Sequence, residues 1–263
     1  MVNYERKPSY GCADLVEIVK LLRAPGGCPW DREQTHASIR RDLLEEAYEV
    51  AEAIDQDSPE HLKEELGDLL LQVVFHAVLA QEEGQFDLDD VADGICKKLI
   101  YRHPHVFGDV TVGSTGEVLK NWEELKKKEK HQTSQADAAD AVARSLPALW
   151  RAEKVQKKAA KVGFDWPDVS GALDKVEEET AELKAAMAGD GDADEEFGDL
   201  LFAAVNVGRF LKLDPEKSLT AATDKFAARF RRVEQAAKAQ GRELKDMTLA
   251  EMDRLWDEVK KQA

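Results

Sequence analysis

The residues best suited to chemistry in this sequence are carboxylates placed one helical turn apart. Residues 44–49 read LEEAYE and are followed by EELGDLL at 64–70. About 130 residues further along, EEETAE at 177–182 is followed by EEFGDLL at 195–201. The spacing inside each motif is kept in both places. The sequence therefore predicts a tandem duplication in which each copy carries the same set of acids.

These acids are placed where a cation is needed. Glu46 and Glu49 lie at the border of the helical apolar stripe centred on Leu43, and Glu179 and Glu182 take the same positions in the second copy. An unpaired carboxylate at the edge of a core is costly, so converging acids require a positive partner. Oxygen ligands suit hard cations, which predicts a Mg²⁺ or Mn²⁺ site. The candidate metal ligands are Glu46, Glu49, Glu65, Asp68, Glu179, Glu182, Glu196 and Asp199.

The soft metal ligands are distributed unevenly. All 6 histidines and all 3 cysteines lie in the first half of the chain. The second copy therefore cannot build a zinc site of histidine and cysteine, although it keeps every acid. A metal site of the same kind in each copy must therefore use oxygen ligands.

Basic and aromatic residues are duplicated together with the acids. Lysine and arginine recur four residues apart, and a tryptophan is followed four residues later by a lysine. Arginine and lysine bind phosphate oxygens, and an indole ring suits a nucleotide base, so we expect a polyphosphate substrate. The sequence has no GxxxxGK[ST] loop to hold the phosphates. The candidate substrate-binding residues are Lys98, Arg102, Trp122, Lys126, Lys225, Arg229, Trp256 and Lys260.

The charge balance excludes other partners. The chain has 37 Lys and Arg against 53 Asp and Glu, a net charge of −16. Nucleic-acid binding needs a basic face, so no nucleic-acid partner is expected. No run approaches the roughly 18 apolar residues of a membrane span. Without a secretory signal or a disulfide framework, we expect a cytoplasmic protein with no membrane association.

The elements that must position these residues are helices. Apolar residues recur at helical spacing over 35–55, and Ser58-Pro59 opens a second helix that Gly84 ends. Asp214-Pro215 opens another helix, which Gly241 ends, and Thr248 with Glu251 forms a capping box before the last one. The predicted class is all-α, with tandem helical-bundle domains at 1–131 and 147–263 and a linker at 132–146 rich in Ala, Asp and small polar residues.

The combined pattern resembles the MazG family of nucleoside triphosphate pyrophosphohydrolases, whose signature is EExxE followed by ExxD. Glu45-Glu46-x-x-Glu49 with Glu65-x-x-Asp68 fits that signature, as does the second copy. The segments GGCPWD at 26–31 and YRHPHVF at 101–107 also resemble the family's N-terminal copy.

The resemblance implies Mg²⁺-dependent hydrolysis of a nucleoside triphosphate to the monophosphate and pyrophosphate, as nucleotide-pool housecleaning by a helical homodimer. It favours the C-terminal copy as the catalytic one, with a regulatory or structural N-terminal copy; the sequence itself keeps the acids in both copies. Lys225, Arg229 and Lys260 are expected at the phosphates and Trp256 at the base, and Glu178 is a candidate base for the attacking water. The catalytic set is then Glu178, Glu179, Glu182, Glu196 and Asp199.

Two other interpretations remain open from the sequence. In one, the chain is a Mg²⁺–nucleotide sensor or regulatory scaffold that binds without turnover. In the other, it is an acidic helical adaptor whose carboxylates form only a solvated face. Release of pyrophosphate, release of orthophosphate, or binding without release would separate these hypotheses.

Overall fold

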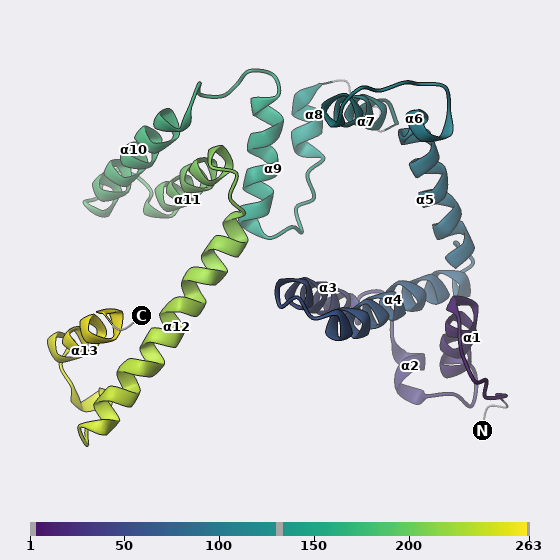
Figure 1. The fold of residues 1–263 in the computed structure, drawn as a ribbon, viewed down its shortest axis with the longest axis horizontal. Coiled ribbons are helices and arrows are strands. Elements are labelled where there is room, and N and C mark those ends of the chain that lie inside the picture. The colour runs from purple at the N-terminus through teal and green to yellow at the C-terminus, as the bar shows by residue number, and fades with distance from the viewer. Residues whose placement is uncertain (1–3, 130–133, 262–263) are drawn as a thin grey trace. The chain divides into compact units, whose positions relative to one another are not determined.

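The computed structural model describes residues 4–129 and 134–261, which form α-helices, one short 3-10 turn and no strand (Figure 1). The predicted all-α fold class is confirmed. Two compact units, Met1–Lys126 and Lys127–Ala263, make up the chain. No helix among the described residues combines the length and the apolar character needed to cross a membrane.

The first unit is organised around an antiparallel helical hairpin. Its helices are α1 (Cys12–Arg23), α2 (Pro29–Glu33), α3 (Arg40–Asp55), α4 (Pro59–Glu82), α5 (Leu88–Arg102), α6 (Pro104–Phe107) and α7 (Thr115–Glu129), the last of which runs across the division between the units. Helices α3 and α4 pack along each other, and α1 packs on α4. Their buried cluster consists of Val19, Ile39, Val74, Phe75, Val78 and Leu79.

The second unit repeats the hairpin. Its helices are α8 (Gln135–Asp140), α9 (Ala148–Ala160), α10 (Val169–Met187), α11 (Ala193–Phe210), α12 (Pro215–Ala239) and α13 (Leu249–Lys261), with the 3-10 turn Leu244–Asp246 before α13. Helices α10 and α11 pack along each other, α9 packs on α11, and α13 packs on α12. A separate small core between α12 and α13 consists of Val233, Ala237, Leu255 and Val259.

Local signals fix the ends of the long helices. The Ser58 hydroxyl accepts a hydrogen bond from the backbone N–H of His61 at 3.4 Å, which caps α4. The Asp214 carboxylate accepts from the N–H of Lys217 at 3.1 Å and caps α12. After these helices Gly84 and Gly241 adopt φ values of 69° and 70°, the left-handed conformation that glycine reaches most easily. The predicted starts and stops of both helices are confirmed.

The helix expected from residue 35 begins later, at Arg40. Thr35 and Ser38 bond to each other instead: each backbone N–H donates to the other's hydroxyl, at 2.9 Å and 3.2 Å. Such side-chain bonds to the local backbone compete with helix formation, which explains the delayed start.

The segment expected to be a linker contains a short helix. Within 132–146 the structure forms α8, capped by the Ser134 hydroxyl, and α8 packs on α9 through the buried Ala138. Residues 132 and 133 lie outside the described residues.

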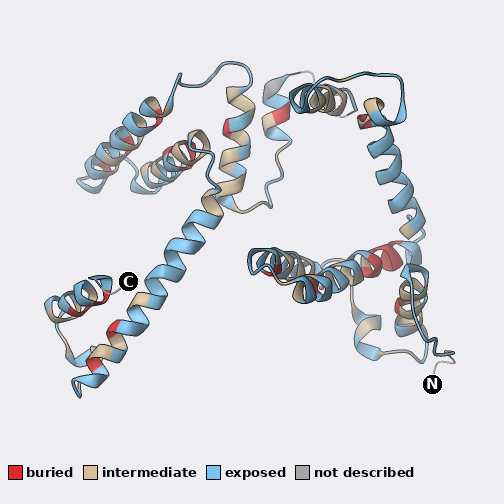
Figure 2. Cartoon of the chain, in the orientation of Figure 1, coloured by how far each residue is buried: buried red, intermediate tan, exposed pale blue. Residues whose placement is uncertain are grey.

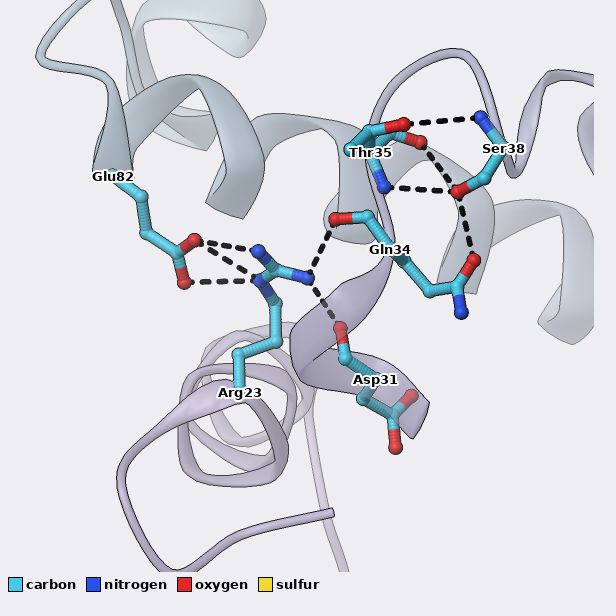
Figure 3. A network of polar contacts seen from close by, with 6 residues as sticks. All are labelled: Arg23, Asp31, Gln34, Thr35, Ser38 and Glu82. Atoms are coloured by element: carbon cyan, nitrogen blue, oxygen red, sulfur yellow. Dashed lines mark hydrogen bonds and ion pairs between the residues drawn. The ribbon is translucent and has the colours of Figure 1, made fainter. Parts of the chain in front are cut away.

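A buried arginine fastens the loop before α3 to the hairpin (Figure 3). Arg23 donates to the two carboxylate oxygens of Glu82, with Nε–Oε1 at 3.0 Å and Nη2–Oε2 at 2.7 Å. It also donates to the backbone carbonyls of Asp31 and of Gln34, the latter at 3.2 Å. Only 7% of the Arg23 side chain is exposed. One guanidinium on α1 therefore satisfies groups of α4 and of α2 with its C-cap at once.

We expect Arg23→Met to destabilise the chain by about 2–4 kcal/mol, because the Gln34 carbonyl and the Glu82 carboxylate lose their guanidinium donor and the Asp31 carbonyl keeps only the N–H of Gln34. The midpoint of urea unfolding, followed by tryptophan fluorescence, should fall accordingly. Lys20→Met is the matched control, since Lys20 and Glu17 form an exposed pair at 3.4 Å that contributes little. Equal midpoints for the two variants would contradict the role given to Arg23.

The third long helix of each copy is largely uncovered (Figure 2). Every residue from 91 to 101 in α5 and from 219 to 228 in α12 is exposed. The exposed residues include the helical stripe Val91, Ile95 and Leu99 in α5, and Leu219 and Phe226 in α12. Apolar stripes of this kind usually pack on another surface.

Candidate functional site

Each hairpin gathers three carboxylates at one place along its length. In the first unit Glu46 and Glu49 of α3 meet Glu65 of α4, and one oxygen from each lies within 4.8 Å of the others. In the second unit a group of the same kind consists of Glu179 of α10 with Glu196 and Asp199 of α11. The convergence arises because the antiparallel packing of each helix pair sets EExxE against ExxD.

Each cluster contains one carboxylate that is almost removed from solvent. Glu65 is 8% exposed and Glu179 is 4% exposed. Burying a carboxylate without a compensating partner is costly. Both clusters are therefore arranged to receive positive charge.

The acids in the clusters raise one another's pKa. Partial burial, followed by the negative charges of Asp68 and Glu49, raises the pKa of Glu46. Partial burial and the charges of Glu182 and Glu179 do the same for the pKa of Glu196. Asp68 and Glu182 lie outside the two groups of converging oxygens, and their charges still act on them. A cation among these oxygens would oppose every one of these shifts.

A different side chain accompanies each cluster. In the first unit His61 Nε2 lies 2.9 Å from Glu65 Oε1. In the second unit Lys175 forms ion pairs with Glu178, at 2.9 Å, and with Glu179. Hydrogen bonds to Glu179 and Glu178 raise the pKa of Lys175.

Lys175 is not among the residues predicted from the sequence, because it is not duplicated in the first copy. The position that matches Lys175 in the first copy is Asp42. Its spacing was a usable signal, since Lys175 precedes Glu178 by three residues and Glu179 by four.

The structure brings three of the four basic and aromatic candidates of the first copy together. The Arg102 guanidinium lies 5.1 Å from the centre of the Trp122 ring, and the Lys126 ammonium lies 4.9 Å from it. Arg102 is buried, whereas Lys98 is exposed on α5. Trp122 thus contacts two cations of its own chain.

The corresponding tryptophan in the second copy has an aromatic neighbour. Trp256 of α13 lies against Phe226 of α12, with ring centres 5.2 Å apart, and Phe226 is parallel to Phe230 within 8°. Lys225 and Lys260 are exposed, and Arg229 is partly exposed. Phe226 and Phe230 were not candidates from the sequence, because the matching residues of the first copy are Leu99 and His103.

The acids and the basic residues of the second copy belong to different helix pairs. The acid cluster lies on α10 and α11, whereas the basic and aromatic residues lie on α12 and α13. Among the described residues, the structure shows no extended packing of α13 on α10 or α11. Helix α12 does contact α11, but within the described part of the chain no ion pair joins Lys225, Arg229 or Lys260 to the acid cluster.

Two histidines in the first unit form a pair away from the acids. His36 Nδ1 and His76 Nδ1 lie 2.8 Å apart, with the rings 6° from parallel and their centres 5.1 Å apart. That separation equals the N–N distance plus the two ring radii, so the rings meet edge to edge with their Nδ1 atoms at hydrogen-bonding distance. Partial burial, followed by the neighbouring His36, lowers the pKa of His76.

We expect the His36–His76 pair to make the first unit less stable in mild acid. A lowered pKa means that the unfolded chain takes up the proton more readily than the folded chain, so stability falls as the pH drops below about 6.5. His76→Val, which installs the residue of the matching position Val207, should remove part of this dependence. The fall in melting temperature between pH 7.5 and pH 5.5 should be a few degrees smaller in the variant. An equal fall in both proteins would contradict the prediction.

The donor set of each cluster fits a hard divalent cation. The converging atoms are carboxylate oxygens within 4.8 Å of one another, and Mg²⁺ and Mn²⁺ bind such oxygens. Duplicated helical hairpins, each with a cluster of converging carboxylates, define an all-α class of protein with two candidate cation sites.

Comparison with known proteins identifies the family. The model of the MazG nucleotide pyrophosphohydrolase domain matches residues 34–107. The "Nucleoside triphosphate pyrophosphohydrolase/pyrophosphatase MazG" of Thermotoga maritima is 46% identical over 94% of this chain and 94% of its own length. The "Nucleoside triphosphate pyrophosphohydrolase" of Escherichia coli K12 is 47% identical over 94% of this chain and 96% of its own length. The chain belongs to the MazG family.

A solved structure is also similar in sequence. The crystal structure of a MazG-related protein from Thermotoga maritima is 30% identical, covers 44% of this chain and 98% of its own, and superposes with a TM-score of 0.39.

Proposed function

We propose that this chain is a Mg²⁺-dependent nucleoside triphosphate pyrophosphohydrolase that forms the nucleoside monophosphate and pyrophosphate. The observation that carries the proposal is the convergence of three carboxylates in each hairpin, within 4.8 Å of one another. The names of the relatives from Thermotoga maritima and Escherichia coli support the same activity. The role would be housecleaning of the nucleotide pool in the cytoplasm.

The second copy would carry the chemistry. Glu179, Glu182, Glu196 and Asp199 would hold the divalent cation, with Mn²⁺ as an alternative to Mg²⁺. When bound, the cation supplies charge neutralisation of the triphosphate and lowers the pKa of a coordinated water. The first copy would bind a cation through Glu46, Glu49, Glu65 and Asp68, as a regulatory or structural domain.

The remaining residues would bind and position the substrate. Lys225, Arg229 and Lys260 would hold phosphate oxygens, with Trp256 at the base. The corresponding residues of the first copy are Lys98, Arg102, Lys126 and Trp122. Glu178 is exposed and lies beside the converging carboxylates, where it would accept the proton of the attacking water.

We also propose a homodimer in which each active site takes residues from both chains. No ion pair among the described residues joins the acid cluster of α10 and α11 to the basic residues of α12 and α13, although one reaction needs both. The hairpin exposes apolar side chains such as Phe197 and Leu201, and α12 exposes Leu219 and Phe226. Packing α12 of one chain on the hairpin of its partner would cover both surfaces and complete the site.

The decisive test of the activity is the product. Purified protein incubated with each nucleoside triphosphate and Mg²⁺ should release pyrophosphate, and EDTA should abolish the release. Release of orthophosphate would contradict attack at the α-phosphorus. Tight binding without release would favour the alternative of a nucleotide sensor, and neither binding nor release would favour the acidic adaptor.

A further inference from the structure

The two acid clusters differ in the positive charge that already lies among them. In the second unit Lys175 pairs with Glu178 and Glu179, and the side chain of Glu179 is only 5% exposed. An ammonium group therefore occupies an oxygen of the most buried carboxylate in the cluster. That oxygen belongs to a residue that would also hold a metal ion.

The first cluster has no such ammonium. Asp42 takes the position of Lys175, one turn before Glu46. The neighbouring cation, Arg41, reaches Glu45 at 4.0 Å on the outer face, where both side chains are more than half exposed. Among the described residues, no lysine or arginine pairs with Glu46, Glu49 or Glu65.

An ammonium group on one oxygen of a carboxylate keeps its positive charge close to any metal ion that the same carboxylate binds. A metal ion entering the second cluster therefore either shares the Glu179 carboxylate with Lys175 or displaces the lysine, and in both cases the two positive charges lie side by side and repel each other. That repulsion is relieved when an anionic ligand is also present. At the first cluster the group beside the buried Glu65 is the imidazole of His61, at 2.9 Å, and not an ammonium group.

We propose that Lys175 is an internal counter-cation that weakens metal binding at the second cluster until a phosphate-bearing ligand is bound. The first cluster, without this lysine, binds the metal ion on its own. This inference rests on the proposed metal sites and adds the condition under which the second one binds its metal ion. Because coupling is reciprocal, metal and polyphosphate favour each other's binding at the second cluster. The catalytic copy would then load its metal together with its substrate.

The test is the binding of Mn²⁺ alone, measured by electron paramagnetic resonance and calorimetry on the full-length chain. The background variant Glu46→Gln/Glu49→Gln removes ligands of the first cluster, so that the second cluster is titrated. In this background, Lys175→Met should tighten Mn²⁺ binding by roughly three- to tenfold, the scale of one partly buried ion pair. Lys175→Arg keeps the charge and should leave the affinity close to that of the background.

The first copy supplies the reciprocal experiment. In a Glu179→Gln/Glu196→Gln background, which leaves the first cluster to be titrated, Asp42→Lys should weaken Mn²⁺ binding by a similar factor. Circular dichroism checks that each variant is folded, and Lys175→Gln is the second variant if Lys175→Met is not.

The outcomes separate this inference from the proposed function. Mn²⁺ binding that is unchanged or weaker on removal of Lys175 overturns the inference and leaves the metal sites in place. Failure of the wild-type chain and of all variants to bind Mn²⁺ overturns the metal sites and the inference together.

Discussion

Glu179→Gln should lower pyrophosphate release by about 10³-fold, the equivalent of about 4 kcal/mol of lost transition-state stabilisation. Glu179 is the most buried acid of its cluster, and its oxygen converges with those of Glu196 and Asp199. The amide removes the negative charge and one anionic ligand while keeping the size of the side chain. The measurement is the initial rate of pyrophosphate release at saturating Mg²⁺.

The duplication supplies the matched comparison. Glu46 is the counterpart of Glu179 in the first copy, and Glu46→Gln should change the rate by less than about threefold if the second copy is catalytic. Glu177→Gln is the surface control, because Glu177 is exposed on α10 and does not belong to the converging group. A large loss in Glu46→Gln with little loss in Glu179→Gln would assign catalysis to the first copy instead.

The helices were predictable where local chemistry fixes them. Ser58 and Asp214 cap α4 and α12, a proline follows each cap, and Gly84 and Gly241 end the helices. These signals act within a few residues and are visible in the sequence. The predicted start of α3 was wrong by five residues. Thr35 and Ser38 form side-chain hydrogen bonds that compete with the helix, and the spacing of apolar residues gives no information about such bonds.

The part of the candidate site that follows from the spacing of the acids was predictable from the sequence. Acids three residues apart share a helix side, and an antiparallel hairpin then sets two such pairs together. The partners of those acids from outside the motifs were not predicted. His61 and Lys175 occupy positions that differ between the copies, so a search for duplicated residues passes over both.

Helical periodicity also does not predict which surface covers an apolar stripe. The stripe centred on Leu43 predicts a buried face, but Ala47 and Ile54 on that stripe are exposed. The same holds for Val91, Ile95 and Leu99 of α5. A period identifies the face that needs a partner, but it does not identify the surface that covers this face.

Mixing two inactive variants should restore activity if each site is shared between two chains. Glu179→Gln damages the acid cluster and leaves α12 intact, whereas Arg229→Ala damages α12 and leaves the acid cluster intact. A mixed dimer then combines the undamaged cluster of one chain with the undamaged α12 of the other. Co-expression of the two variants should yield about one quarter of wild-type activity, since half of randomly formed dimers are mixed and each holds one intact site.

The control combines two variants that both change the acid cluster. Glu179→Gln co-expressed with Glu196→Gln should recover nothing, because every acid cluster in every dimer is then damaged. Light scattering during gel filtration gives the mass of each preparation, and a monomeric mass would contradict the dimer directly. If the dimer forms and the first pair still recovers nothing, the acids and the basic residues of one chain serve the same site. In that case α12 and α13 must close onto α10 and α11 of their own chain when substrate binds, and the dimer interface has another purpose.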